Sequence, residues 1–233
     1  MSKGFFITGT DTGVGKTVVT ALLASMLSKR GLQVGVMKPV ETGCPREGGR
    51  LVPQDSLFLR QVSGCTAPQE LVTPYTFAEP LAPAIAAELA GSIIEMKHIR
   101  KCYEQLLAEH DIVLVEGAGG LLVPLTAQLC MHDLAVELNL PLLVVACNRL
   151  GAINHTLLTV TVARERSQVL GIVLNHIQAL NKDLAVQTNA DALRRWGKVP
   201  LLGQVPYMSG VTAETLSSFV EQSTIHQLLT ALY

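Results

Sequence analysis

The sequence of 233 residues is poor in aromatic side chains and in charge. Only 4% of the residues are aromatic and 16% are charged, and 18 Lys and Arg against 19 Asp and Glu leave a net charge of −1. Nucleic acids and anionic membranes require a basic protein surface, so this near-neutral balance argues against both as partners. The scarcity of aromatics argues against a stacking platform for single strands.

Cysteine pairs and long apolar runs are also missing. The five cysteines are odd in number and none shows Cys-x-x-Cys spacing, which favours free thiols in a reducing compartment over a disulfide framework or a zinc ribbon. The longest apolar run, residues 140–147, is too short to span a bilayer, and the first residues lack the apolar region of a signal peptide. We therefore expect a cytoplasmic protein without a membrane segment.

What the sequence does contain is an alternation of apolar strands and helices. With 48% hydrophobic residues and a mean hydropathy of +0.35, the chain can form a normal core. Strands are expected at 5–8, 34–37, 112–115, 140–146, 169–174 and 201–205. Helices are expected at 16–29, 55–62, 82–89, 93–108, 131–138, 153–166, 182–195 and 213–229, with residues 40–54 as loop. This pattern predicts a single α/β domain over residues 1–233, with a doubly wound, mainly parallel β-sheet flanked by helices.

Residues 9–17, Gly-Thr-Asp-Thr-Gly-Val-Gly-Lys-Thr, lie between the first expected strand and the first expected helix. Small residues let backbone N–H groups approach phosphate oxygens, and the helix N-terminus favours an anion. Lys16 is placed to reach the β- and γ-phosphates, and the Thr17 hydroxyl to ligate Mg²⁺. The loop departs from the usual pattern, because Thr10 stands at the first glycine position and Gly9 precedes it. The alternative is a tight turn with an exposed lysine, but the strand–loop–helix context favours nucleotide binding and a P-loop NTPase architecture.

Three more charged residues are candidates for the same site. Glu116 follows the strand at 112–115 and precedes glycines, and the carboxyl ends of parallel strands meet at one edge of a sheet. Its carboxylate can hold Mg²⁺ directly or through water. Asp55 is either a helix N-cap or a metal ligand, and the spacing does not decide between them. Lys38 either stabilises charge on a transferring phosphoryl group or is simply solvated, and the sequence alone slightly favours the second.

Five motifs occur together in one order: GTDTGVGKT at 9–17, KPVETG at 38–43, PYTFAEPLAP at 74–83, VEGAGGLLVPL at 115–125 and RLGAINHTLLT at 149–159. This combination resembles the dethiobiotin synthetase family. The resemblance implies an ATP- and Mg²⁺-dependent ligase of biotin biosynthesis. In that family CO₂ adds to one amine of 7,8-diaminononanoate, and the carbamate attacks the γ-phosphate of ATP. The second amine then attacks the carbamic–phosphoric anhydride, so that dethiobiotin, ADP and phosphate form.

The resemblance also implies roles for individual residues. Lys16 and Lys38 are implied to be catalytic, by gripping the γ-phosphoryl group, and the implied Mg²⁺ ligands are Thr17, Asp55 and Glu116. The implied nucleotide-binding residues are Thr12, Gly13, Val14, Gly15, Lys16, Thr17, Val18, Asp55, Glu116, Gly117, Ala118, Gly119, Asn175, Pro206 and Tyr207. The implied substrate-binding residues are Thr12, Lys38, Thr42, Pro80, Gly151, Ala152, Ile153 and Asn154.

Two of these roles concern the ends of the substrates. Residues 151–154 are implied to hold the carboxylate of the diamine across a homodimer interface, although spacing alone makes Asn154 a helix N-cap. Asn175 is implied to read the adenine, because an amide pairs with both donor and acceptor edges. Within KPVETG, Glu41 and the following Cys44 depart from the family's usual pattern.

Other functions stay open at this point. A switch ATPase of the partition or septum-positioning type shares the superfold, but such proteins carry an extra lysine early in the loop, and some end in a basic helix. Residues 10–14 contain no Lys, and residues 213–231 contain no Lys or Arg. A paralogue with another substrate, a non-catalytic nucleotide sensor and a phosphotransferase for another metabolite are further alternatives, since a fold does not name a substrate.

Overall fold

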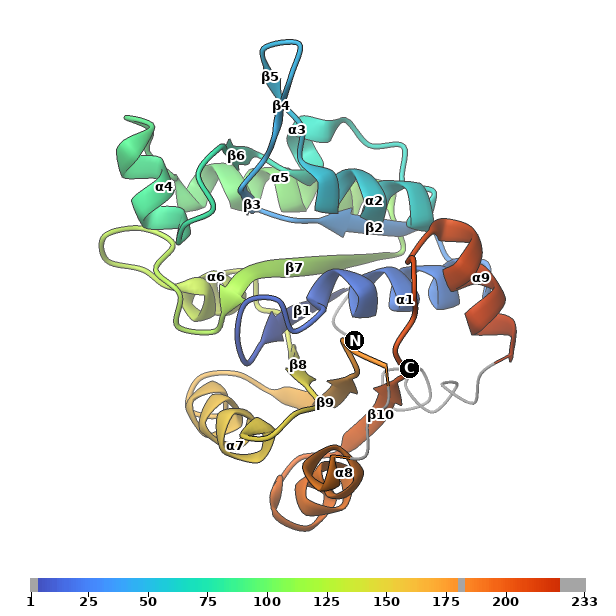
Figure 1. The fold of residues 1–233 in the computed structure, drawn as a ribbon. Coiled ribbons are helices and arrows are strands. Elements are labelled where there is room, and N and C mark those ends of the chain that lie inside the picture. Colours follow the sequence, from blue (N-terminus) through green and yellow to red (C-terminus); the bar gives the residue numbers. More distant parts are fainter. Residues whose placement is uncertain (1–3, 180–182, 223–233) are drawn as a thin grey trace.

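A parallel β-sheet forms the centre of the computed structural model, which describes residues 4–179 and 183–222 (Figure 1). Its six strands have the order β10-β9-β8-β1-β7-β2, and every neighbouring pair is parallel. The strands are β1 (Gly4–Gly9), β2 (Val34–Met37), β7 (Ile112–Gly120), β8 (Leu142–Cys147), β9 (Val169–Asn175) and β10 (Leu201–Val205). This arrangement confirms the predicted fold class.

Helices cover both faces of this sheet. On one face α1 (Lys16–Ser28) packs against α2 (Gln54–Ser63) and α9 (Ala213–Gln222), which lie side by side in Figure 1. Right-handed crossovers that return toward β10 place the remaining long helices on the other face. These are α5 (Met96–Glu109), α6 (Met131–Glu137), α7 (Ala152–Ala163) and α8 (Leu184–Trp196), while α3 (Gln69–Val72) and α4 (Pro83–Leu89) are short.

Burial on both faces explains why the central strands are continuously apolar. All six residues of β1 and all six of β8 are buried. Phe6, Ile7, Leu114 and Leu143 are fully excluded from solvent. Each such side chain stabilises the fold by roughly 1.5–3 kcal/mol, so the strand ends form a rigid edge for a site. The register pairs Ile7 with Glu116, which places the Glu116 carboxylate near the end of β1.

The expected loop at 40–54 was only partly right. β3 (Val40–Thr42) pairs in parallel with β6 (Tyr75–Phe77), and the pair β4 (Arg46–Glu47) and β5 (Arg50–Leu51) forms a hairpin that projects from the molecule (Figure 1). Strands of two or three residues are too short to show a periodic signal. The Gly48-Gly49 turn, with both φ angles positive, is nevertheless a hairpin signal that the sequence carried.

Other boundaries also differ from expectation. β7 does not end at Val115 but runs to Gly120, because the backbone of its glycine-rich end continues to pair with β1. α5 begins at Met96 rather than at Ile93. The final helix is described as far as Gln222, and the rest of the range 213–229 lies outside the described residues, as do residues 180–182. The assignment of one domain to residues 1–233 stays a prediction.

Candidate active site

The predicted phosphate-binding loop connects β1 to α1. Gly13 and Gly15 have φ angles of 73° and 89°, in the left-handed region that favours glycine. A Cβ on Gly9 would lie 2.8 Å from the Asp11 carbonyl oxygen and 3.1 Å from Lys16 Nζ. The position that requires glycine for close packing is therefore Gly9, one residue before the usual place. This explains why a threonine can stand at position 10.

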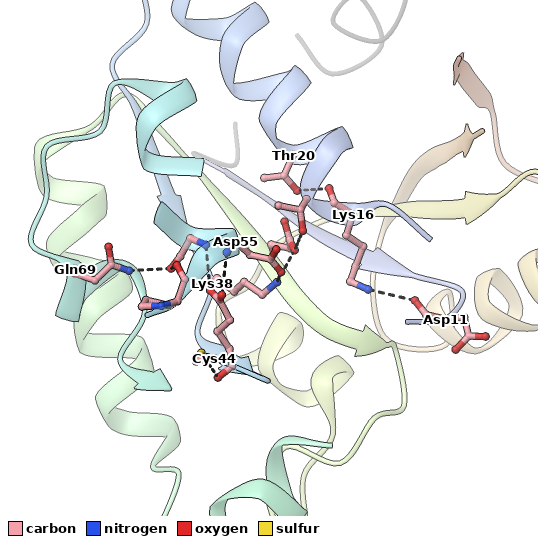
Figure 2. Close-up of polar contacts among 12 residues, drawn as sticks. Asp11, Lys16, Thr20, Lys38, Cys44, Asp55 and Gln69 are labelled. Atoms are coloured by element: carbon pink, nitrogen blue, oxygen red, sulfur yellow. Dashed lines mark hydrogen bonds and ion pairs between the residues drawn. The ribbon is translucent and has the colours of Figure 1, made fainter. Parts of the chain in front are cut away.

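Lys16 is the first residue of α1, and its side chain folds back over the loop. It is only 7% exposed, and its Nζ donates a hydrogen bond of 3.2 Å to the Asp11 carbonyl oxygen (Figure 2). Burial lowers the pKa of Lys16, although the negative charge of Glu116 opposes this shift. The N-terminus of α1 has no side-chain cap and no acidic residue in its first turn. An uncapped helix N-terminus beside a buried ammonium is suited to an anion.

Lys38, just after β2, links two carboxylates at the centre of the site. Its ammonium group contacts Asp55 Oδ2 and lies 2.9 Å from Glu116 Oε1 (Figure 2). Burial alone would lower the pKa of Lys38, but Glu116 and Asp55 together outweigh it and raise the pKa above its ordinary value. Lys38 therefore stays charged at neutral pH, in contrast to the solvated lysine that the sequence alone had slightly favoured.

The oxygen atoms around Glu116 fit a hard cation. Thr17 Oγ1 donates a 2.8 Å hydrogen bond to Glu116 Oε1, whereas the buried Glu116 Oε2 has no hydrogen-bond partner. The Asp55 side chain is 46% exposed and contacts the same Lys38 ammonium group as Glu116. In the described part of the chain no group of three or more His, Cys, Asp and Glu could hold a metal by itself. Mg²⁺ normally takes one or two carboxylates and completes its shell with phosphates and water, so this set suits it.

Asp55 is not the N-cap of α2, so that alternative is wrong. The helix begins at Gln54, with Pro53 at the N-cap position and no capping side chain of its own. The N–H groups of Asp55 and Ser56 instead donate hydrogen bonds of 2.9 and 3.0 Å to the carboxylate of Glu41 on β3. Burial raises the pKa of Glu41, while Lys38 and these N–H groups oppose the shift. This contact could not be predicted from the sequence, because Glu41 and Asp55 are 14 residues apart.

Asn175, the last residue of β9, lies against the phosphate loop. It is 3% exposed, and its Nδ2 donates a 3.0 Å hydrogen bond to the Val14 carbonyl oxygen. A Cβ on Gly15 would lie 1.9 Å from this nitrogen. Pro206 and Tyr207 follow the neighbouring strand β10 and are exposed. These three predicted nucleotide-binding residues thus lie at the ends of two adjacent strands, β9 and β10.

Besides Thr12 of the phosphate loop and Lys38, the predicted substrate-binding residues fall into two groups. Thr42 ends β3, and Pro80 lies beside the neighbouring Gly43, whose Cβ would be 3.2 Å from that of Pro80. Gly151, with φ 90°, is the N-cap of α7, so Asn154 is an exposed first-turn residue and its expected role as N-cap is wrong. In the described chain, no hydrogen bond or ion pair joins residues 151–154 to the Lys38 cluster.

A groove of about 400 Å³ separates α7 from the phosphate loop. Thr10 and Asp11 line one side, and Leu158 and Thr159 of α7 line the other. Arg149, just before α7, forms an ion pair with Asp11, in which Nη2 lies 3.6 Å from Oδ2. On α7 the groove is lined by residues of the middle and C-terminal part of the helix, Leu158, Thr159 and Val162.

Known proteins share both the sequence and the fold. The chain is 37% identical to the "ATP-dependent dethiobiotin synthetase BioD" of Thermodesulfovibrio yellowstonii, over 93% of each chain. It is 49% identical to the protein of that name from Anaeromyxobacter sp. (strain K), over 74% of this chain and 76% of that one. The chain belongs to the ATP-dependent dethiobiotin synthetase family. The predicted resemblance and the predicted class of enzyme, an ATP-dependent ligase, are thereby confirmed.

Broader comparisons concern the type of domain and the fold. A family model described as "AAA domain" matches residues 3–215. In the fold, the chain is similar to a ParA family ATPase from Chlorobium tepidum, with a TM-score of 0.57, 16% identity and complete coverage of both chains. It is also similar to the cell division ATPase MinD of Pyrococcus furiosus, with a TM-score of 0.59, 18% identity and coverage of 100% and 98%. Identities this low show the fold alone. Across the described residues, no helix has the length and apolar character that a membrane span needs.

Proposed function

We propose that the protein closes 7,8-diaminononanoate with CO₂ to dethiobiotin, at the expense of ATP and with Mg²⁺. The observation that carries this proposal is the position of Lys38 in a chain of this family. Its ammonium group is held between Asp55 and Glu116, beside the loop that carries Lys16. Such a site places an ammonium group where a phosphoryl group transfers, and the homologues named dethiobiotin synthetases support the substrate.

The roles of the two lysines differ in this proposal. Lys16 and the N-terminus of α1 bind and orient the β- and γ-phosphates. Lys38 stabilises the negative charge that develops on the γ-phosphoryl oxygens during transfer. Mg²⁺, held by Thr17, Asp55 and Glu116, would neutralise phosphate charge when bound.

The reaction needs no nucleophile from the protein, because the carbamate formed from CO₂ and one amine attacks the phosphorus. In the described part of the chain, the hydrogen-bond partners of the Lys38 ammonium group are Asp55 and Glu116, not a cysteine or histidine. The carbamic–phosphoric anhydride then loses phosphate when the second amine attacks its carbonyl. The residues accelerate these steps by positioning and by charge stabilisation. In this proposal Thr12 and Thr42 supply hydroxyl groups for the carbamate and the diamine, and Pro80 contacts the diamine.

A second copy of the chain completes the substrate site in this proposal. Residues 151–154 stand at the exposed N-terminal turn of α7, where a carboxylate is favoured. Large apolar side chains of this region face solvent: Leu150, just before α7, is 81% exposed, and Leu158 on α7 and Leu122, which line one groove, are each 59% exposed. Such a patch is suited to burial against another protein surface. The carboxylate of one subunit's diamine would then be bound by Asn154 of the other subunit.

Analysis of the products by mass spectrometry tests the proposal. The protein is incubated with Mg²⁺, ATP, ¹³C-bicarbonate and 7,8-diaminononanoate. We expect a cyclic urea that carries one labelled carbonyl, together with one ADP per ring. ATP consumption without this product would support a paralogue with another substrate, and a phosphorylated metabolite without bicarbonate dependence would support a phosphotransferase.

A further inference from the structure

We propose that Glu41 is a positioning residue, which caps α2 from a neighbouring strand and so leaves the Asp55 carboxylate free to face Lys38 and the nucleotide-bound cation. The proposal rests on the proposed function insofar as it assigns that cation to Asp55. Nothing in the family resemblance pointed to Glu41, which departs from the usual pattern of its motif.

The starting observation is a helix that lacks a cap of its own. α2 has ten residues, and neither Pro53 nor another residue at its start provides a side-chain cap. Asp55 is of a type that readily caps a helix, and a carboxylate turned toward its own backbone could not reach Lys38. Instead, both oxygens of Glu41 receive the first-turn N–H groups, at 2.9 Å from Asp55 and 3.0 Å from Ser56. A negative charge at this end of a helix is favourable.

The backbone that carries Glu41 is itself held in place. Glu41 lies in the middle of β3 and is paired with Thr76 of β6. Its side chain is 5% exposed, which would be unfavourable for a carboxylate without hydrogen-bond donors. On the other side of the same turn, Ser56 is fully buried and accepts a 2.8 Å hydrogen bond from Gln69 Nε2 (Figure 2). The first turn of α2 is thus fixed from two sides, and the direction of Asp55 is fixed with it.

The negative charge of Glu41 acts near Lys38 but does not pair with it. Glu41 contributes a third negative charge near Lys38, but its oxygens are directed at backbone N–H groups and not at the ammonium. Lys38 therefore binds the carboxylates of Asp55 and Glu116, and Glu41 acts through Asp55. A residue with this function should affect cation binding even though it touches neither cation nor substrate.

The first test uses hydrogen exchange in the wild-type protein without nucleotide. First-turn amides of a helix usually exchange fast, because they have no intrahelical partner. We expect the amides of Asp55 and Ser56 to be protected, and we expect the isosteric substitution Glu41→Gln to reduce that protection at least about tenfold, since one oxygen becomes a donor. Glu47→Gln removes the same charge from the exposed hairpin of the same segment and should leave protection unchanged. Unprotected amides in the wild type would overturn the proposal without any variant.

The second test separates positioning from a general effect on the fold. Mn²⁺ binding in the presence of a non-hydrolysable ATP analogue, followed by electron paramagnetic resonance, should weaken about tenfold in Glu41→Gln. In an Asp55→Asn background, the same substitution should weaken Mn²⁺ binding no further, because its effect passes through Asp55. Additive losses in the double variant, or unchanged Mn²⁺ affinity in Glu41→Gln, would overturn the proposal. Exchange is measured without substrate, so a failure to form dethiobiotin would reject the proposed function alone.

Discussion

The contact between Asn175 and the phosphate loop predicts an unequal response to alanine at two loop glycines. Gly13 and Gly15 both have positive φ angles, 73° and 89°. A Cβ on Gly13 would meet no atom within 4 Å, whereas one on Gly15 would lie 1.9 Å from Asn175 Nδ2. The two substitutions therefore share the same backbone strain, and only Gly15→Ala adds a steric conflict.

The magnitudes follow from these two terms. Alanine in the left-handed region costs roughly 1–2 kcal/mol, and this is the whole expected effect of Gly13→Ala. In Gly15→Ala the buried amide of Asn175 must also move, which breaks its 3.0 Å hydrogen bond to the Val14 carbonyl oxygen. Loss of a buried hydrogen bond that leaves its partner unsatisfied costs about 1–3 kcal/mol. We therefore expect Gly15→Ala to lower the free energy of unfolding by about 2–5 kcal/mol.

Urea unfolding without nucleotide measures both variants under one condition. A double variant, Gly15→Ala with Asn175→Ala, removes the conflicting amide. Its loss of unfolding free energy should be smaller than the sum of the losses measured in Gly15→Ala and in Asn175→Ala. If Gly15→Ala destabilises the protein no more than Gly13→Ala, the packing of Asn175 against the loop is not what we describe. Additive losses in the double variant would refute the reasoning in the same way.

Three more predictions concern charge and substrate. Lys38→Ala should lower kcat far more than ATP affinity in steady-state and equilibrium titrations, because its charge acts mainly in the transition state; weaker ATP binding with unchanged kcat would contradict this. Asn154→Ala should raise the KM of the diamine and leave that of ATP unchanged, and an unaltered diamine KM would remove this residue from the substrate site. The Cys130 N–H and, further, Arg166 lower the pKa of Asp133 to about 2, from 3.8. Since the folded-state pKa is the lower one, this stabilisation is complete above about pH 4–5 and is lost as the pH falls toward 2. Asp133→Asn should therefore lower the free energy of unfolding at pH 6 by about 1–2 kcal/mol, a value reduced for partial exposure, and should flatten its decline between pH 5 and pH 2.5 in urea titrations.

The sheet was predictable because its strands are buried on both faces. Runs such as residues 112–115 and 140–146 carry their own signal, and the rule that parallel strands end at one edge brings Lys38 and Glu116 to the phosphate loop. β3 and β6 gave no comparable signal, because each has only three residues and depends on the other for its hydrogen bonds. Their discovery matters for function, since β3 carries both Glu41 and Thr42.

Asp55 shows where prediction from sequence stops. A helix-initial aspartate is compatible with capping and with metal binding, and its near neighbours do not distinguish these roles. The distinction depends on the folded structure, because α2 begins one residue before Asp55 and Glu41 caps the first-turn N–H groups of Asp55 and Ser56. Asn154 is the parallel case, because the left-handed Gly151 takes the N-cap position and leaves the amide exposed. In both cases the folded structure excludes the N-cap role, which sequence spacing had left open for Asp55 and had favoured for Asn154.

Lys38 and Lys16 have different hydrogen-bond and ion-pair partners, and this difference predicts different roles for them. Lys38 is bound by two carboxylates, one of them fully buried, and loss of Lys38 would leave the buried Glu116 carboxylate without its counter-charge. Lys16 has no carboxylate within ion-pair distance in the described part of the chain, and only a carbonyl oxygen receives its hydrogen bond. A buried ammonium compensated so incompletely gains most from an arriving polyanion, whereas Lys38 already has its counter-charges. Lys16 should therefore contribute chiefly to binding of the triphosphate. Lys38 should contribute chiefly when charge shifts onto the transferring group, because its ground-state charge is already balanced by Asp55 and Glu116.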